Sequence, residues 1–276
     1  MPDSMLKAQI ESASAYERLF VPALFGQWAP RVANAAGIAA GDRVLDVACG
    51  TGVLAREAAQ RAGPHGKVTG VDPAAGMLAV AARLAPSIEW REGAAEALPF
   101  PDEAFDVVVS QFGLMLFADR GLAVREMQRV LAPGGRLAVA VWNEIGSNPA
   151  YQDEAALLEE IAGRRAADAI RSPFSLGDRD RLAALFVAAG MTKVTVDTLE
   201  GKARFPDIRT MVEADLRGWL PVTGVVLAED EIAEVLVRAE QALAPYRAPD
   251  GTVAFAVSAH LLTGRKSHDT ESATAA

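Results

Sequence analysis

The sequence has a single cysteine, few aromatic residues and fewer basic than acidic side chains. Cys49 alone cannot form an intrachain disulfide or a site of several thiolates, so we expect a reducing, cytoplasmic setting. The formal charge of -9 gives a field that repels phosphate backbones and anionic membranes. No apolar run approaches the roughly 18 residues of a membrane-spanning helix, and the charged N-terminal residues are not typical of a signal peptide. These absences argue against nucleic-acid and membrane partners.

Apolar residues make up about half of the 276 positions, which is enough for one large α/β core. Within residues 42–142, short apolar runs alternate with amphipathic patterns, as is typical of βα units around a parallel sheet. We expect strands at 43–47, 67–71, 88–91, 105–110 and 136–142, and helices at 53–62, 74–85 and 121–131. The last of these strands should follow a turn at Pro133-Gly134-Gly135.

The flanks of this core are mostly helical in pattern. Residues 4–36 concentrate aromatic side chains and predict an N-terminal helical lid. Beyond the core, we expect helices at 151–166 and 179–189, strands at 193–205 and 252–263, and a helical substrate cover between these two strands. The expected organisation is one domain at 1–264, with a lid at 1–36, a cofactor-binding core at 37–145, a C-terminal part at 146–264, and a disordered tail at 265–276.

A glycine-rich loop follows the first expected strand, at the edge where open α/β sheets bind ligands. Gly50 and Gly52 let the backbone approach a nucleotide closely, and the next helix offers free N–H groups. Residues 50–55 also satisfy the dinucleotide pattern G-x-G-x-x-G/A, which leaves an NAD-dependent oxidoreductase open. Asp72, at the end of the second strand, can accept hydrogen bonds from both hydroxyls of a ribose, although it could also only cap the following helix.

Asp46 favours a positively charged cofactor. A carboxylate beside the glycines attracts an ammonium or sulfonium group, whereas it would repel a diphosphate. The loop therefore predicts a sulfonium cofactor better than a dinucleotide.

Four motifs occur in order, namely VLDVACGTG, VTGVDPAAGML, EGAAEALPFPDEAFDVVVSQFGLMLFAD and EMQRVLAPGGRLAVAVW. Over roughly residues 40–145 the chain resembles the class I S-adenosylmethionine-dependent methyltransferases of the ubiquinone/menaquinone-biosynthesis type. The resemblance implies a Rossmann-like α/β fold: a seven-stranded, mostly parallel sheet with a reversed last strand, a helical lid and a helical insertion between the last two strands. It also implies methyl transfer from S-adenosyl-L-methionine to a small-molecule acceptor by in-line displacement, with S-adenosyl-L-homocysteine as product.

The resemblance assigns the loop to the methionine portion, Asp72 to the ribose and Met77 to the adenine ring. The expected cofactor-binding residues are Asp46, Ala48, Gly50, Thr51, Gly52, Asp72, Pro73, Met77, Gly93, Ala94, Ala95 and Gln111. Relatives commonly have an aspartate where this chain has Ala94. One hydrogen bond to the adenine amino group, worth about 0.5–1.5 kcal/mol, is therefore missing.

The sequence gives little information about the identity of the acceptor. Candidate pocket residues are Tyr16, Phe25, Trp28, Phe112, Met115, Trp142 and Asn143, each with ordinary packing as its alternative. Tyr16 and His260 are weak catalytic candidates, and a lone histidine in an apolar strand is more often structural. We expect no metal and a monomer or homodimer. A module that binds the cofactor without catalysis is a third hypothesis.

Overall fold

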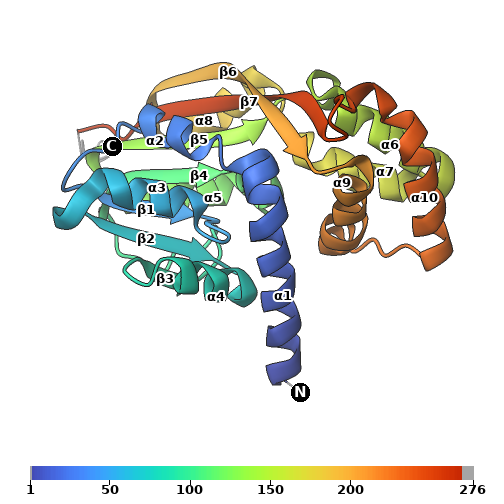
Figure 1. The fold of residues 1–276 in the computed structure, drawn as a ribbon. Coiled ribbons are helices and arrows are strands. Elements are labelled where there is room, and N and C mark those ends of the chain that lie inside the picture. The colour runs from blue at the N-terminus through green and yellow to red at the C-terminus, as the bar shows by residue number, and fades with distance from the viewer. Residues whose placement is uncertain (1, 269–276) are drawn as a thin grey trace.

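A seven-stranded sheet of order β3-β2-β1-β4-β5-β7-β6 organises the computed structural model, which describes residues 2–268 (Figure 1). The strands are β1 (Arg43–Val47), β2 (Lys67–Asp72), β3 (Glu89–Glu92), β4 (Phe105–Gln111), β5 (Leu131–Trp142), β6 (Thr192–Phe205) and β7 (Val253–Arg265). Strands β1 to β5 pair in parallel, and β7 runs antiparallel to both β5 and β6. The predicted fold class, including the reversed last strand, is confirmed.

Helices cover both faces of this sheet. They are α1 (Pro2–Phe20), α2 (Ala29–Ala35), α3 (Val53–Ala62), α4 (Ala75–Leu84), α5 (Arg120–Val130), α6 (Pro149–Ala162), α7 (Arg164–Arg171), α8 (Arg179–Ala188), α9 (Ile208–Ala214) and α10 (Glu229–Ala242). Short turns of π-helix form η1 (Val21–Phe25) and η6 (Asp215–Trp219), and 3₁₀ turns form η2 (Gly63–His65), η3 (Leu114–Leu116), η4 (Ile145–Ser147), η5 (Ser172–Phe174), η7 (Leu220–Thr223) and η8 (Ala244–Tyr246). Helices α2 and α3 contact each other on one face, and α5 and α8 contact each other on the other (Figure 1).

The apolar pattern of the sequence accounts for the central layer. Strand β4 reads FDVVVSQ, and Val107, Val108 and Val109 are completely buried because helices cover both faces. Helix α3 buries Leu54 and Ala58 on the face that it turns toward the sheet. These elements fix the carboxyl edge of the sheet, where the functional loop lies.

Two expectations were wrong, one about the start of β5 and one about the start of the disordered tail. Strand β5 begins at Leu131, before the expected turn, and its register against β4 shifts between Phe105 and Val107. Lys266 accepts a hydrogen bond from the N–H of Gly134 and donates one to the carbonyl of Gly135. Residues 265–268 are therefore bound to the sheet rather than disordered, and residues 269–276 lie outside the described part.

Two helical parts stand at the edge where the parallel strands end (Figure 1). Helix α1 lies along α4, and Gln9 packs so closely on Gly76 that a Cβ there would lie 2.6 Å from it. On the other side α6, α7, α9, η6, η7 and α10 gather into what we call the helical lobe. The lobe therefore includes the predicted insertion between β6 and β7, together with α6 and α7 from earlier in the chain.

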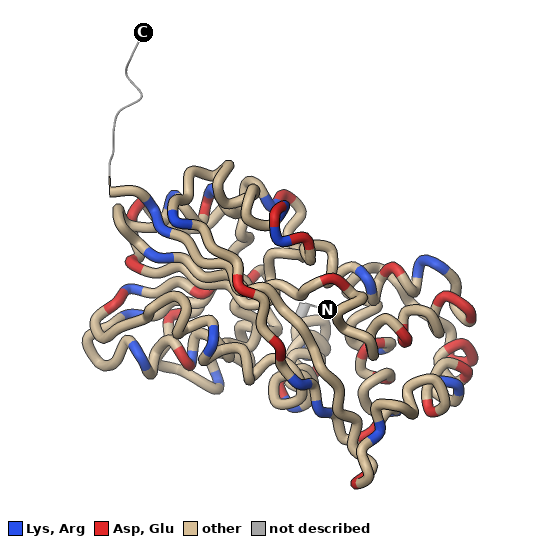
Figure 2. Tube along the Cα trace, turned by 90° about the horizontal axis from the view of Figure 1, so that it is seen from above, with Lys and Arg blue, Asp and Glu red and all other residues tan. Residues whose placement is uncertain are grey.

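Acidic and basic residues are interspersed along the trace in Figure 2, and several acidic positions lie on the helical lobe. Among residues 2–268, no helix combines the length and the apolar character needed to cross a membrane. The expected absence of a nucleic-acid partner stays a prediction.

Candidate active site

The backbone turns sharply after β1. Ala48, Gly50 and Gly52 have φ angles of 56°, 55° and 84°. This left-handed region costs a residue with a side chain about 1–2 kcal/mol, whereas glycine enters it freely. No atom outside the immediate chain lies within 4 Å of the position that a Cβ on Gly50 would take. The loop therefore presents bare backbone with open space beside it.

Trp90 of β3 supports this loop. A Cβ added to Gly52 would lie 2.4 Å from the indole ring, and one added to Gly70 of β2 would also lie 2.4 Å from it. The indole N–H donates to the carbonyl of Ala85 at 3.0 Å, which fixes the ring. The second glycine of the loop is thus required by packing as well as by its φ angle. Sequence reasoning missed Trp90, because no local signal shows that it reaches Gly52.

Asp72 connects the loop to the end of β2. Its Oδ2 accepts from the N–H of Gly50 and its Oδ1 from the N–H of Ala74, both at 2.9 Å. Burial raises the pKa of this carboxyl despite the two hydrogen bonds. The contact with Ala74 matches the alternative in which Asp72 caps the following helix. The contact with Gly50 shows that Asp72 also holds the glycine-rich loop in place. Each oxygen keeps a lone pair that can accept from a ligand hydroxyl.

Several buried polar atoms around the loop have no hydrogen-bond partner in the part of the chain that the structure describes. These atoms are Asp46 Oδ2, Thr51 Oγ1, Ser110 Oγ and Gln111 Oε1. Burial raises the pKa of Asp46 well above its usual value, the charge of Asp72 raises it further, and the N–H of Ala55 partly offsets the effect. An unsatisfied buried polar group costs about 1–3 kcal/mol. A ligand with ammonium or hydroxyl donors fits this set, because it would supply the missing donors and a positive charge.

The expected adenine-contacting residues meet at the same edge. Pro73 is exposed before α4, Met77 is half-buried in its first turn, and the N–H of Gly93 donates to the carbonyl of Asp72 at 3.2 Å. Ala94 is exposed and Ala95 is buried. The nearby carboxylate of Glu96 does not replace the missing aspartate, because its Oε1 accepts from the N–H groups of Ala118 and Asp119 at 2.8 and 3.3 Å.

Helix α1 is fastened over the loop. Arg56 of α3 binds Glu17 of α1 at 2.8 Å and the carbonyl of Thr51 at 2.7 Å. Tyr16 stacks on Phe25 with ring centroids 5.5 Å apart. Burial raises the pKa of the Tyr16 phenol, and the charges of Glu17 and Asp72 raise it further. The phenol thus lies near Asp72, as the expected lid requires, and the Arg56–Glu17 contact was missed by the sequence reasoning.

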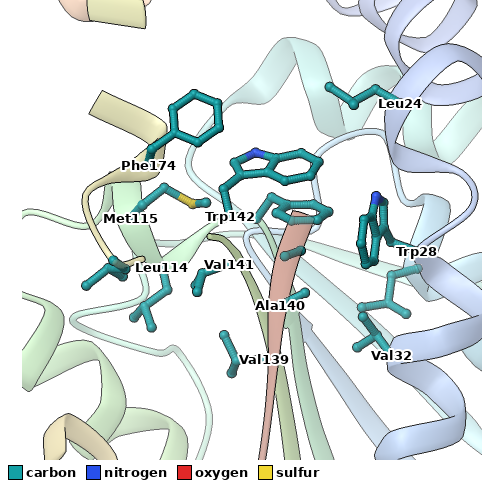
Figure 3. Packing of buried hydrophobic residues seen from close by; sticks show 14 of the residues in the cluster. Leu24, Trp28, Val32, Leu114, Met115, Val139, Ala140, Val141, Trp142 and Phe174 are labelled. Carbon is teal, nitrogen blue, oxygen red and sulfur yellow. The ribbon is translucent and has the colours of Figure 1, made fainter. Parts of the chain in front are cut away.

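Aromatic side chains converge beyond the ends of β4 and β5. Phe112 and Trp142 stack nearly parallel, with centroids 3.9 Å apart and an angle of 13°. Phe25 lies 5.6 Å from Phe112, Trp28 meets both stacked rings edge-on, and Phe174 lies 6.4 Å from Trp142. Figure 3 shows Trp142 between Trp28 on one side and the side chains of Met115 and Phe174 on the other. Five of the seven candidate pocket residues therefore lie in one cluster, which we call the aromatic wall: Phe25, Trp28, Phe112, Met115 and Trp142. Tyr16 adjoins it through Phe25.

Phe112 has a strained backbone, since its φ angle is 55°. Its N–H donates to the carbonyl of Ala140 at 2.9 Å, which together with the stack on Trp142 holds the residue in place. A bulky residue in this region costs about 1–3 kcal/mol and is found mostly at functional sites. The N-terminal segment is joined to this point, because the amide of Gln111 donates to the carbonyl of Phe25 at 3.2 Å.

His260 and Asn143 lie elsewhere. The Nε2 of His260 bonds the carbonyl of Gly177 at 2.7 Å and its Nδ1 the hydroxyl of Thr198 at 3.0 Å, so both ring nitrogens have structural partners. Burial lowers the pKa of His260, which favours the neutral ring. The amide of Asn143 donates to Ser258. Both residues line a cavity of about 530 Å³ together with residues 177–180, and not the aromatic wall. The partners of His260 favour its structural alternative, and Asn143 lies at this cavity beside it; both site assignments stay predictions.

Potential metal ligands are dispersed within residues 2–268. In this part of the chain, no three His, Cys, Asp or Glu side chains are grouped so that they could hold a metal ion.

Comparison with known proteins gives results that agree with this geometry. Residues 44–135 match the model of a family described as a methyltransferase domain. A ubiquinone/menaquinone biosynthesis C-methyltransferase of Pseudomonas aeruginosa is 34% identical over 190 residues, covering 63% of this chain and 74% of that protein. The corresponding enzyme of Hahella chejuensis is 45% identical over 118 residues, covering 41% of this chain and 47% of that protein, so the match spans less than half of its length.

A likeness to a solved structure extends over most of the chain. The YcgJ protein from Bacillus subtilis has a TM-score of 0.58 and 21% identity, and the match covers 88% of this chain and 99% of that one. At this identity the likeness establishes the fold alone. The family match and the sequence relatives favour a methyltransferase over the alternative of an NAD-dependent oxidoreductase.

Proposed function

We propose that this chain methylates a planar aromatic acceptor of the hydroquinone kind. The chain belongs to the family of class I S-adenosylmethionine-dependent methyltransferases of small molecules, which includes the ubiquinone/menaquinone C-methyltransferases. The observation that supports this acceptor class is the parallel stack of Phe112 on Trp142 at 3.9 Å, located at the carboxyl edge of the sheet. Aromatic faces of this kind bind flat rings by offset or edge contacts worth about 0.5–1.5 kcal/mol each.

In this proposal the cofactor lies along the loop. The backbone of Gly50 and Gly52 borders the methionine portion, and the unpaired oxygens of Asp46 and Gln111 accept from its ammonium group. Asp72 holds the ribose hydroxyls and Met77 packs on the adenine. The remaining members of the predicted set, Ala48, Thr51, Pro73, Gly93, Ala94 and Ala95, contribute backbone and small side chains along the same edge.

When bound, S-adenosylmethionine supplies a methyl group on a positively charged sulfur. The residues of the chain then have to align the acceptor and exclude water, and such positioning can supply roughly 7–11 kcal/mol of the barrier. Phe25, Trp28 and Trp142 form a largely apolar surround for this purpose. The raised pKa of the Tyr16 hydroxyl keeps it protonated. Tyr16 therefore donates a hydrogen bond to an anionic oxygen of cofactor or acceptor, and does not act as a base.

Replacing Asp72 tests the ribose assignment. We expect Asp72→Ala to weaken S-adenosylmethionine binding by at least about tenfold, equivalent to about 1.4 kcal/mol, because both ribose contacts and the anchor of Gly50 are lost. Isothermal titration calorimetry gives the affinity. The matched control is Asp106→Ala, which removes a partly exposed carboxylate near the opposite end of the sheet, paired with Arg43. Equal affinity of Asp72→Ala and wild type would mean that the ribose is held elsewhere.

Transfer of a labelled methyl group tests the acceptor class. We expect label from S-adenosylmethionine to enter a demethylated naphthohydroquinone or benzohydroquinone and not an aliphatic amine of similar size. Cofactor binding by calorimetry is the control for a competent protein. Label found only in amines would overturn the aromatic acceptor. Firm cofactor binding with no transfer to any acceptor of the panel would instead favour the non-catalytic binding module.

A further inference from the structure

Residues 94–98 form a short loop after β3, which we call the rim loop. Its two ends meet, because Pro99 packs on Gly93: a Cβ added to Gly93 would lie 3.0 Å from the Cδ of Pro99 and 3.1 Å from the Cγ2 of Val71. The N–H of Gly93 donates to the carbonyl of Asp72 at 3.2 Å. The start of the rim loop is therefore attached to the end of β2, beside the carboxylate assigned to the ribose.

Two side chains of α5 hold the other end of the rim loop. Arg129 binds Glu126 through two hydrogen bonds, from Nε to Oε1 and from Nη2 to Oε2, each at 2.7 Å. The same guanidinium donates to the carbonyls of Leu98 and Phe100 at 3.1 and 2.9 Å. The Oε2 of Glu126 also accepts from the N–H of Leu98 at 3.0 Å. Both backbone groups of Leu98 are thus bound by this pair of side chains, which we call the fork.

The fork is charged and only partly exposed to water. The side chains of Arg129 and Glu126 are 30% and 17% exposed, and the hydrogen bonds from Arg129 hold the pKa of Glu126 below its usual value. Bidentate hydrogen bonds between ionised groups are stronger and more directional than neutral ones. Arg129 also donates to Asp102 at 2.7 Å, and its carbonyl accepts from the N–H of Glu103 at 3.1 Å. The chain that leaves the rim loop is therefore bound along its length.

The middle of the rim loop is bound to the other end of α5. The Oε1 of Glu96 accepts from the N–H groups of Ala118 and Asp119 at 2.8 and 3.3 Å. Asp119 is the N-cap of α5, since its Oδ1 accepts from the N–H of Leu122 at 2.8 Å. One helix thus fixes the rim loop at two points, through Glu96 before its first turn and through the fork in its last turn.

The residues of the rim loop make this rigidity important for recognition of a base. The side chains of Ala94 and Ala95 cannot donate or accept a hydrogen bond, so only their backbone groups can. A side chain can adjust its own position to a ligand, whereas backbone groups are placed by the loop that carries them. A loop that is ordered before binding raises affinity, because the ordering is not lost from the binding free energy.

We infer that the Glu126–Arg129 fork positions the adenine end of the cofactor: it fixes Leu98, so that the backbone of the rim loop contacts the edge of the base in place of the carboxylate that Ala94 lacks. The fork acts through the loop and does not itself touch the cofactor. This role rests on the proposed function, since it uses the cofactor site assigned there.

The test measures the preference for adenine by calorimetry, with S-adenosyl-L-homocysteine and S-inosyl-L-homocysteine as ligands. In the inosyl compound a carbonyl oxygen replaces the amino group and N1 carries a proton, so donor and acceptor are exchanged. We expect wild type to prefer the adenosyl compound by at least about tenfold, because fixed backbone groups are left unpaired by the wrong base. Arg129→Gln should bind the adenosyl compound about tenfold more weakly and prefer it by less than about threefold, since a loosened loop adapts to either base.

Arg43→Gln is the matched control. Arg43 also binds a carboxylate, that of Asp106, through two side-chain hydrogen bonds, but it lies at the start of β1, away from the cofactor loop. Its replacement should leave the affinity and the preference within about twofold of wild type. A loss of stability alone would affect both ligands equally, so the preference separates positioning from a structural role. An unchanged preference in Arg129→Gln, or no preference in wild type, would overturn the positioning role.

Hydrogen exchange tests the fork without a ligand. The amide of Leu98 should exchange at least about tenfold faster in Arg129→Gln than in wild type, and equal protection would overturn the fork as an anchor. If Arg129→Gln does not fold, Glu126→Gln replaces it, because glutamine keeps an oxygen for the N–H of Leu98 and loses the charge that Arg129 binds. The same change in preference is then expected, and its absence counts against the role. Binding of neither ligand by wild type would overturn the proposed function, whereas binding of both without preference would overturn the positioning role alone.

Discussion

Gly52→Ala is expected to weaken S-adenosylmethionine binding by at least about a hundredfold, equivalent to about 2.8 kcal/mol. The new Cβ would lie 2.4 Å from the indole of Trp90 at a φ angle of 84°. The backbone conformation alone costs an alanine about 1–2 kcal/mol, and forcing an atom into a packed site typically costs about 1–3 kcal/mol more. The loop relieves this strain by moving away from Trp90, which removes the backbone surface that borders the cofactor. Calorimetry measures the loss of affinity, and thermal unfolding measures the loss of stability.

A matched control separates the clash from the backbone strain. Gly224 has the same left-handed conformation as Gly52, with φ 77° and ψ 20°, but the nearest atom to its Cβ position is Arg165 Nη2 at 4.0 Å. Gly224→Ala should therefore destabilise the fold by about 1–2 kcal/mol and leave cofactor affinity almost unchanged. Adding Trp90→Leu to Gly52→Ala should recover part of the affinity, because the indole no longer occupies the space. If the two alanine variants bind the cofactor equally well, the cradle formed by Trp90 has no role in binding.

The regular elements of the core could be predicted because their signals are local. Strand β1 and helix α3 have the expected bounds, since a run of apolar residues and a glycine on each side of the helix define them. The loop between them was found for the same reason, because a nucleotide site needs glycines at fixed spacing. The bulge in β5 was not found, since Pro133 and the two glycines after it are more typical of a turn than of a strand.

Contacts between distant segments could not be predicted. Trp90 and Gly52 meet only after β2 and β3 have paired, and Arg56 reaches Glu17 only after α1 has folded back over α3. The sequence signal of His260 allowed two roles, and its hydrogen bonds to Gly177 and Thr198 favour the structural one. The N-terminal segment was expected to cover the site because it is rich in aromatic residues. The arrangement of its rings could not be predicted, because it depends on contacts with Phe112 and Trp142, which follow β4 and end β5.

Trp142→Leu is expected to lower kcat/KM for the acceptor by about a hundredfold while the affinity for S-adenosylmethionine stays within about twofold. Trp142 contacts four other aromatic rings, and its removal frees Phe112 from the stack at 3.9 Å. Phe112 is held at a φ angle of 55° partly by that stack, so the residue is expected to relax toward an ordinary conformation. A displacement of the acceptor by about 1 Å is sufficient to cost about a hundredfold in rate.

The control for this variant is Phe105→Leu, which also exchanges a buried aromatic side chain for leucine but lies at the opposite end of β4. It should reduce stability and leave kcat/KM per folded molecule within about threefold of wild type. Equal losses of kcat/KM in the two variants would show that the effect of Trp142 is one of stability. A loss of cofactor affinity in Trp142→Leu would place the indole against the cofactor instead. The result expected from the aromatic wall is a selective loss, because Trp142 touches the rings that surround the acceptor and none of the residues assigned to the ribose.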